Sequence, residues 1–257
     1  MKKPIIFLLA VLVSISSYAQ MTEGNPSAKK IRTGNRPVAG YYGIYLGATS
    51  TMFEGIGKGD DLKINALPLI NFKYMSTDRA EWRLGLELYS KSSSVGGTSY
   101  SSDGKSDVAV SMTKSGNGIV KFYPGFAYHF SPVNILDIYT GVEVPIGFDF
   151  VNSTSTYTLK TDAIVQKQNK TIFNLGVGAF VGMQVFIANL PIAAGLEYGL
   201  SVNGSFGNKN KITHTENNKT ETYYCLDNQM SQKYSKLVSN TGILGQQFRI
   251  TLSYYFK

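Results

Sequence analysis

The chain has 257 residues, of which 43% are hydrophobic but only 16% are charged, whereas an average soluble domain is about 25% charged. It contains 26 glycines, 17 tyrosines, 14 phenylalanines and one cysteine, and its formal net charge is +8. This composition excludes a disulfide-stapled secreted scaffold, a charge-rich disordered chain and a cysteine-based metal-cluster protein.

The first residues have the pattern of an export signal. Lys2 and Lys3 precede an apolar run that ends at Val13, and Ala19 completes a small-residue cleavage site, as in signal peptides. The apolar run is too short for a transmembrane helix, which needs about 20 residues, and no later stretch is long enough. We therefore expect a signal peptide over 1–19, a flexible polar leader over 20–39 and one folded domain over 40–257.

From position 40 onward apolar and polar residues alternate, which is typical of β-strands with two different faces. The clearest case places Trp82 on one face and Arg83 on the other. Around Pro68 the alternation fails, which predicts a bulge. The alternating segments are 41–48, 64–74, 81–89, 120–130, 137–150, 173–187, 192–202 and 247–256.

The two faces of these segments differ in charge. One face carries no charge and no glycine, whereas the other carries glycines and equal numbers of acids and bases. Glycine weakens a strand whose polar face lies in water, but it suits a narrow barrel with little interior room. A charge-free exterior suits lipid, because a cation at the bilayer midplane costs about 2–4 kcal/mol. We predict an interior charge network of Lys73, Arg83, Glu87, Lys121, Glu143, Asp149, Glu197 and Arg249.

The connections alternate in length, with short turns at 76–79, 131–135 and 188–190 and long loops at 53–61, 93–116, 151–170 and 207–242. Short periplasmic turns and long extracellular loops are the arrangement of outer-membrane barrels. We therefore predict an all-β fold, an eight-stranded antiparallel transmembrane up-and-down β-barrel with the leader and both termini in the periplasm. An aromatic girdle at one rim would comprise Tyr42, Tyr74, Trp82, Tyr128, Tyr254 and Phe256.

Residues 108–112 also alternate and leave an alternative of ten strands open. One added strand would make the count odd and reverse the later order of long and short connections. We therefore interpret 98–113 as a hairpin extension above the membrane, with its turn at 102–105.

The chain resembles the small Gram-negative outer-membrane β-barrels of the OmpA/OmpX type, often grouped as porin-family or outer-membrane β-barrel domain proteins. The resemblance covers about residues 40–257 and rests on architecture. Its most family-like segment is the last strand, which is similar to the C-terminal signal read by the barrel-assembly machinery, although Lys257 follows the final aromatic. The apolar residues of this signal are Phe248, Ile250, Leu252, Tyr254 and Phe256.

Candidate catalytic chemistry is sparse. His129 falls on the interior face, where a structural hydrogen bond is expected, and His214 falls in the longest loop. Lipid A palmitoyltransferases and deacylases on similar small barrels place a histidine with a serine and an acid at the outer rim, but no such local motif surrounds His214. Cys225 has no partner cysteine. We therefore expect no enzymatic activity, no metal site and no cofactor.

The expected function is a structural or surface-binding role carried by the loops, with the interior filled by the charge network. A small-solute channel is the alternative, followed by a lipid A-modifying enzyme. Loop 207–242 contributes five lysines and three tyrosines that suit lipopolysaccharide phosphates or an extracellular ligand. The expected partners are outer-membrane lipid, lipopolysaccharide and the barrel-assembly machinery, without nucleic acid, and the expected state is a monomer.

Overall fold

The computed structural model describes residues 36–49, 69–100, 107–130, 135–159, 162–187 and 190–257. The predicted signal peptide, most of the predicted leader, loop 53–61, the bulge around Pro68, and the turns at 102–105, 131–134 and 188–189 lie outside these residues. No helix within the described ranges has the length and apolar character to cross a membrane.

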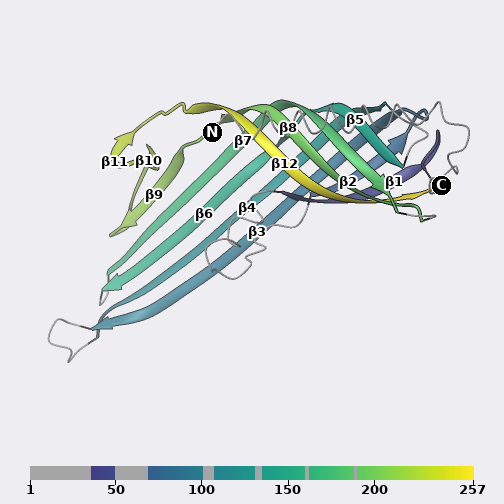
Figure 1. The fold of residues 1–257 in the computed structure, drawn as a ribbon. Coiled ribbons are helices and arrows are strands. Elements are labelled where there is room, and N and C mark those ends of the chain that lie inside the picture. Colours follow the sequence, from purple (N-terminus) through teal and green to yellow (C-terminus); the bar gives the residue numbers. More distant parts are fainter. Residues whose placement is uncertain (1–35, 50–68, 101–106, 131–134, 160–161, 188–189) are drawn as a thin grey trace, which may run out of the picture. The chain divides into compact units, whose positions relative to one another are not determined.

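The described residues form twelve strands in one antiparallel sheet (Figure 1). In chain order they are β1 (Tyr42–Thr49), β2 (Leu69–Met75), β3 (Ala80–Tyr100), β4 (Asp107–His129), β5 (Leu136–Glu143), β6 (Ile146–Leu159), β7 (Asp162–Phe186), β8 (Ile192–Phe206), β9 (Asn210–Glu216), β10 (Lys219–Leu226), β11 (Gln229–Tyr234) and β12 (Asn240–Phe256).

The strand pairing closes into a ring. β1 to β4 pair in succession, β4 pairs with β5 and β6, both of these pair with β7, and β8 and β12 lead back to β1. Tyr42 lies opposite Phe256 at the closing pair. The ring therefore has eight positions, one of which is shared by β5 and β6.

A proline explains the interruption between β5 and β6. Glu143 pairs with Gly125 and Ile146 pairs with Phe122, so the register on β4 continues unchanged across the gap. Pro145 has no N–H to donate to the ladder, but its carbonyl still accepts a hydrogen bond from the Gly176 N–H at 2.8 Å. β5 and β6 are therefore two halves of one strand position.

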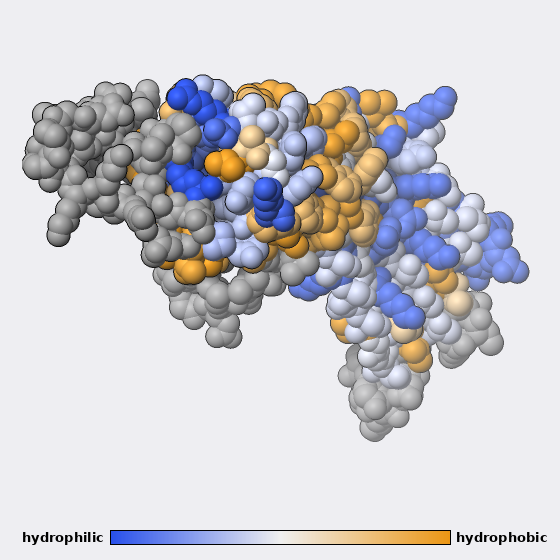
Figure 2. Space-filling model, turned by 90° about the vertical axis from the view of Figure 1, so that its right-hand side faces the viewer, coloured by the Kyte–Doolittle hydropathy of each residue, from blue (hydrophilic) through white to orange (hydrophobic). Residues whose placement is uncertain are grey.

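The exposure of the ring inverts the usual order of a soluble protein. Trp82 is 57% exposed and Val177 is 62% exposed, whereas Arg83 and Arg249 are buried. Figure 2 shows the exposed apolar side chains as an orange band across the visible face, with hydrophilic side chains beside it. We call these outward residues of the ring the apolar band.

Glycines on the inward face make room for aromatic rings. A Cβ atom added to Gly182 would lie 2.3 Å from the Tyr139 ring, and one added to Gly43 would lie 2.9 Å from the Tyr255 ring. The interior is therefore packed closely enough that glycine is required beside these tyrosines.

Two segments predicted as long loops are instead largely β-strand. β6 and β7 pair through the segment predicted as loop 151–170, as far as Leu159 opposite Asp162. β3 and β4 likewise pair from the ring outward to Val110, which confirms the hairpin extension. Figure 1 shows these four strands running together beyond the others. For β6 and β7 the loop prediction was wrong because mostly polar residues occupy both faces of the extension, so apolar alternation stops where pairing continues.

The predicted loop 207–242 contains β9, β10 and β11. β9 pairs with β7 at residues 165–169, β10 pairs with β9, and β11 pairs with β10. Asn217 and Asn218 have φ values of 48° and 59° between β9 and β10, and asparagine is favoured at such positions in a tight hairpin turn. The ring is thus continued on one side by a small outer sheet.

Candidate functional site: the buried ionic cluster

Every position of the ring contributes a buried polar or aromatic side chain to the interior. The contributing residues, taken around the ring, are Tyr45 of β1, Lys73 of β2, Arg83 of β3, His129 of β4, Tyr139 of β5, Gln184 of β7, Glu197 of β8 and Arg249 of β12. Each position of the ring therefore supplies at least one buried polar or aromatic group to the interior.

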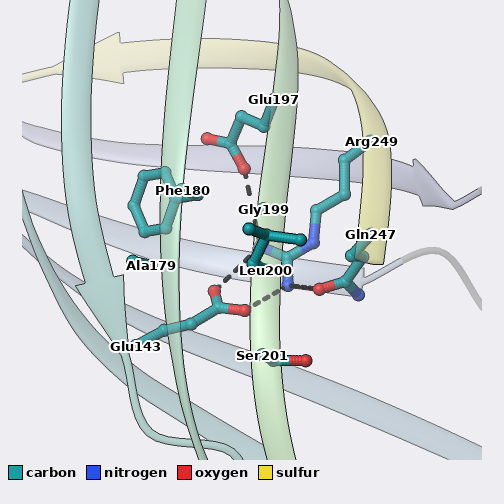
Figure 3. A pocket seen from close by; sticks show the side chains of 9 residues that line it. All are labelled: Glu143, Ala179, Phe180, Glu197, Gly199, Leu200, Ser201, Gln247 and Arg249. Carbon is teal, nitrogen blue, oxygen red and sulfur yellow. Dashed lines mark hydrogen bonds and ion pairs between the residues drawn. The ribbon is translucent and has the colours of Figure 1, made fainter. Parts of the chain in front are cut away.

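Arg249 is the centre of one half of the cluster (Figure 3). Its Nη1 and Nη2 atoms donate to the two carboxylate oxygens of Glu143 at 2.9 and 2.6 Å, and Nη2 also donates to Gln247 at 2.6 Å. Nη1 lies 3.5 Å from Glu197. Two parallel bonds to one carboxylate are the strongest arrangement available to arginine.

A small recess adjoins this arginine, bordered by Glu143, Glu197, Ser201 and Gln247 among others. Its volume is about 10 Å³, which is room for about one water molecule. Arg249 Nε is buried and donates to no group in the described part of the chain. Because it has room for about one water molecule, the recess is too small for an organic solute.

Arg83 connects this half to the other. It donates to Glu197 Oε1 at 2.6 Å through Nη1 and to Glu81 through Nε. Glu197 also accepts from the Tyr139 hydroxyl at 2.9 Å. Glu197 therefore bridges two guanidinium groups and carries the ionic contacts from β3 across to β12.

The other half of the cluster joins Glu81, His129 and Asp137. His129 Nδ1 lies 2.6 Å from Asp137, and its Nε2 lies 3.4 Å from Glu81. Asp137 also contacts Arg36 at 3.0 Å, and Lys73 lies 3.5 Å from Glu81. The leader was predicted to be flexible over 20–39, but its described end contributes an ion pair to the cluster, and Pro37 beside Arg36 is buried.

Aromatic faces complete the contacts of the buried cations. Lys73 Nζ lies 4.7 Å from the centre of the Tyr45 ring and donates to the Tyr255 hydroxyl at 3.1 Å. The Arg83 guanidinium lies 4.7 Å from the Phe180 ring and 4.9 Å from the Tyr139 ring. Such contacts stabilise a cation that has been removed from water.

The cluster is close to electrically neutral. Apart from His129, four bases stand against four acids: the bases are Arg36, Lys73, Arg83 and Arg249, and the acids are Glu81, Asp137, Glu143 and Glu197. Neutrality matters because an uncompensated buried charge costs several kcal/mol.

The structure brings five of the eight predicted network residues into this cluster: Lys73, Arg83, Glu143, Glu197 and Arg249. Lys121 and Asp149 form a separate, partly exposed pair at 3.0 Å. Glu87 accepts a hydrogen bond from the Tyr123 hydroxyl instead of pairing with a base.

Sequence reasoning missed Glu81, Asp137 and Arg36. Glu81 and Asp137 each stand two residues before an inward residue, Arg83 and Tyr139, so strict alternation would have found both. No sequence pattern singles out Arg36, because it lies in a polar segment that precedes the first strand.

The six residues predicted as an aromatic girdle are all exposed and form a band across β12, β1, β2, β3 and β4. The Tyr42 ring lies 5.1 Å from Tyr74 and 6.2 Å from Phe256, which in turn lies 6.0 Å from Tyr254. The residues of the predicted assembly signal, Phe248, Ile250, Leu252, Tyr254 and Phe256, all point outward along β12.

His214 and Cys225 lie in the small outer sheet. His214 Nε2 is 3.5 Å from Glu216, and no serine hydroxyl contacts this ring among the hydrogen bonds of the described residues. Cys225 is buried, its Sγ lies 3.6 Å from Met230 Sδ, and burial raises the pKa of its thiol.

No family model and no curated protein matches this chain. Among solved structures, a major outer membrane protein from Thermus thermophilus aligns at 12% identity over 85% of this chain and 100% of its own, with a TM-score of 0.38. A loop L8 deletion mutant of OmpT, an outer membrane protein of Vibrio cholerae, aligns at 11% identity over 87% and 100%, with a TM-score of 0.11. Both scores lie below 0.5, so neither likeness defines this fold.

Proposed function

We propose that this chain is an integral outer-membrane β-barrel of eight membrane-spanning strands, closed inside by the buried ionic cluster, with a structural or surface-binding role carried by the extended hairpins and outer sheet. The observation that carries the proposal is the inversion of the ring, with an exposed apolar band outside and a neutral ionic cluster inside. Lipid is the solvent that makes this arrangement stable, because in water the exposed band would drive aggregation.

The direction of the chain in the membrane follows from the lengths of its connections. The short turn between β2 and β3 lies at the end where β1 begins and β12 ends, and the extended hairpins lie at the other end. Outer-membrane barrels have short periplasmic turns, so we infer periplasmic termini and extracellular hairpins. The export signal predicted from the sequence would deliver the chain to the periplasmic side of the outer membrane. The proposed partners are lipid, lipopolysaccharide and, through the last strand, the barrel-assembly machinery, and the proposed state is a monomer.

Single-channel recording in planar bilayers tests the closed interior. We expect the purified protein to show no stable conductance at the level of open porins. A variant that combines Glu143→Ala with Arg249→Ala is expected to raise the conductance, because it removes the bidentate pair that spans β5 and β12. Reproducible open-porin conductance of the unaltered protein would favour the small-solute channel instead.

The proposal includes no catalytic role for His214. Mass spectra of lipid A from cells with and without the protein test this point. Unchanged spectra are expected, whereas a gained or lost acyl chain would replace the proposal with that of a lipid A-modifying enzyme.

A further inference from the structure

The strands that extend past the apolar band carry three lysines on one face. Residues paired across an antiparallel ladder point their side chains to the same side, so the face can be followed from strand to strand. Lys114 of β4 pairs with Thr154 of β6, Thr154 pairs with Lys167 of β7, and Lys167 pairs with Thr213 of β9. These residues point to the same side of their strands as the apolar band, and we call this face the outer extension face.

Lys211 joins the two lysines on this face. It pairs with Asn169, two residues from Lys167 on the same side of β7. Lys167 and Lys211 are therefore diagonal neighbours with Cα atoms about 7–8 Å apart. Lys114 lies two strand spacings from Lys167, about 10 Å away. The three ammonium groups can thus converge on one or two anions.

The positive charge of the outer extension face is not balanced by acidic side chains of the residues that the structure describes. Lys114, Lys167 and Lys211 are exposed, and none of them forms an ion pair with any residue that the structure describes. The acids of the outer sheet have contacts elsewhere: Asp227 pairs with Lys170, Glu221 pairs with Lys233, and Glu216 lies beside His214. Acidic side chains therefore neutralise the opposite face and leave this one positive.

Of the other lysines of the predicted basic loop, Lys209 faces the same side but is engaged in contacts of its own, whereas Lys219 and Lys233 lie on the opposite face. Lys209 donates to the Leu237 carbonyl and lies over the Tyr224 ring, and Lys233 is paired with Glu221. Strand pairing places Lys211 of that loop on this face, and its two companions come from the extended hairpins. The basic site is thus assembled by strand pairing and is not a property of one loop.

The height of the site selects its ligand. The outward Phe150 of β6 pairs with Gly118, and Lys114 lies four residues beyond Gly118 on the same face of β4, which is about 14 Å along the strand and about 10 Å above the apolar band at a tilt of about 45°. Two exposed apolar residues, Met112 and Val110, follow on the same face farther from the ring. The polar layer of a phospholipid leaflet is only about 5–8 Å thick. An anion at the height of these lysines must therefore be carried on a headgroup that extends well above the hydrocarbon.

We propose that Lys114, Lys167 and Lys211 form a docking surface for phosphate groups on the sugars of lipopolysaccharide in the leaflet beside the protein. The inference rests on the membrane location proposed above. Lysine binds phosphate as a compact positive charge, and the apolar band directly below the site places the acyl chains of the same glycolipid against the ring. One ligand would then contact the apolar band through its chains and the lysines through its phosphates.

The test is binding of phosphorylated lipopolysaccharide to the folded full chain in neutral detergent, followed by native mass spectrometry. The variant combines Lys114→Gln, Lys167→Gln and Lys211→Gln. A matched control combines Lys91→Gln, Lys219→Gln and Lys233→Gln, which removes the same charge from the opposite face of the strands. We expect about fivefold weaker binding for each lysine of the site, about a hundredfold for three, and little change in the control.

Two further probes identify the source of the phosphate. Lipopolysaccharide treated with a phosphatase should bind the unaltered protein as weakly as phosphorylated lipopolysaccharide binds the triple variant. Inorganic phosphate at the same concentration should not bind detectably. Equal binding of the treated lipid, equal loss in the control variant, or binding of inorganic phosphate that displaces the lipid would each overturn the proposal.

Membrane location is read separately, by fractionation of cells that express each protein. Recovery of the chain outside the outer membrane would refute the proposed function. Failure of the lysine variant to weaken binding in detergent, with correct fractionation, would refute only the docking surface.

Discussion

Replacement of Arg249 by methionine tests whether the ionic cluster is a fully compensated unit. Arg249 is 2% exposed, and its loss leaves Glu143 without its bidentate partner and Glu197 with Arg83 as its remaining guanidinium. Removing one partner of a buried ion pair costs about 3–5 kcal/mol. At an m value of about 2 kcal/mol/M, this loss shifts the urea midpoint down by about 2 M.

The single tryptophan provides the assay. Trp82 is outward-facing and belongs to the apolar band, so its emission reports transfer between lipid and water during urea titration in vesicles. Combining Arg249→Met with Glu143→Leu should recover most of the lost stability, because a buried pair replaced by apolar residues is often neutral or stabilising.

Arg79 provides the control. It lies in the exposed turn between β2 and β3, and Arg79→Met should change the free energy of unfolding by less than about 0.5 kcal/mol. The reasoning is refuted if Arg249→Met destabilises no more than Arg79→Met, or if the double variant is less stable than the single one. Either result would mean that Glu143 and Glu197 find compensation in water that enters the interior.

Three more variants or conditions probe other parts of the molecule. Gly182→Ala places a Cβ against the buried Tyr139 ring and should cost about 1–3 kcal/mol in the same urea titration; an unchanged midpoint would mean that the ring has room to move. Val181→Arg puts a cation in the apolar band and should cost about 2–4 kcal/mol, whereas a band that faces water would tolerate it. In the outer sheet, hydrogen bonds from Lys170 and Asn210 lower the pKa of Asp227, so its contribution to stability is complete above the ordinary carboxyl pKa and is lost as the pH falls through the lowered value. The protection factors of the β10 amides, which are corrected for the intrinsic exchange rate at each pH, should therefore fall only in acid, and a fall near neutral pH would contradict this assignment.

Alternation identified the ring because lipid and interior impose opposite demands on successive residues. Val177 and Gly178 illustrate the rule, since the first is exposed and the second is buried against β8. The same rule stops at the edge of the apolar band. Beyond it polar residues occupy most positions on both faces of β6 and β7, so segment 151–170 resembles a loop although residues 151–159 pair with residues 162–170.

The sequence predicts which residues belong to the ionic cluster more readily than it predicts which of them contact each other. The alternation of inward and outward residues places Arg83 and Glu197 on the inward face, but it does not specify that the two side chains contact each other. Their contact depends on the stagger of strands around the ring, because the two residues are 114 positions apart in the sequence. Arg36 could not have been predicted, since its role depends on where the chain enters the first strand. The three lysines of the outer extension face were equally hidden, because their grouping depends on the register of β4, β7 and β9.

When β12 pairs with β1, the ring closes and the buried ionic cluster is completed in the same step. Lys73 on β2 reaches the Tyr255 hydroxyl on β12, across 182 residues of sequence, and Arg249 brings the last guanidinium to Glu143 and Glu197. Until the final strand arrives, both edges of the sheet lack partners in lipid, Glu143 lacks its bidentate cation, and Glu197 has Arg83 as its guanidinium partner. In an intermediate whose ring is still open, the unpaired strand edges and the unpaired buried charge therefore both raise the free energy. We expect insertion to be slow, as for chains dominated by distant contacts, and to end in one cooperative step in which the seam and the interior close together.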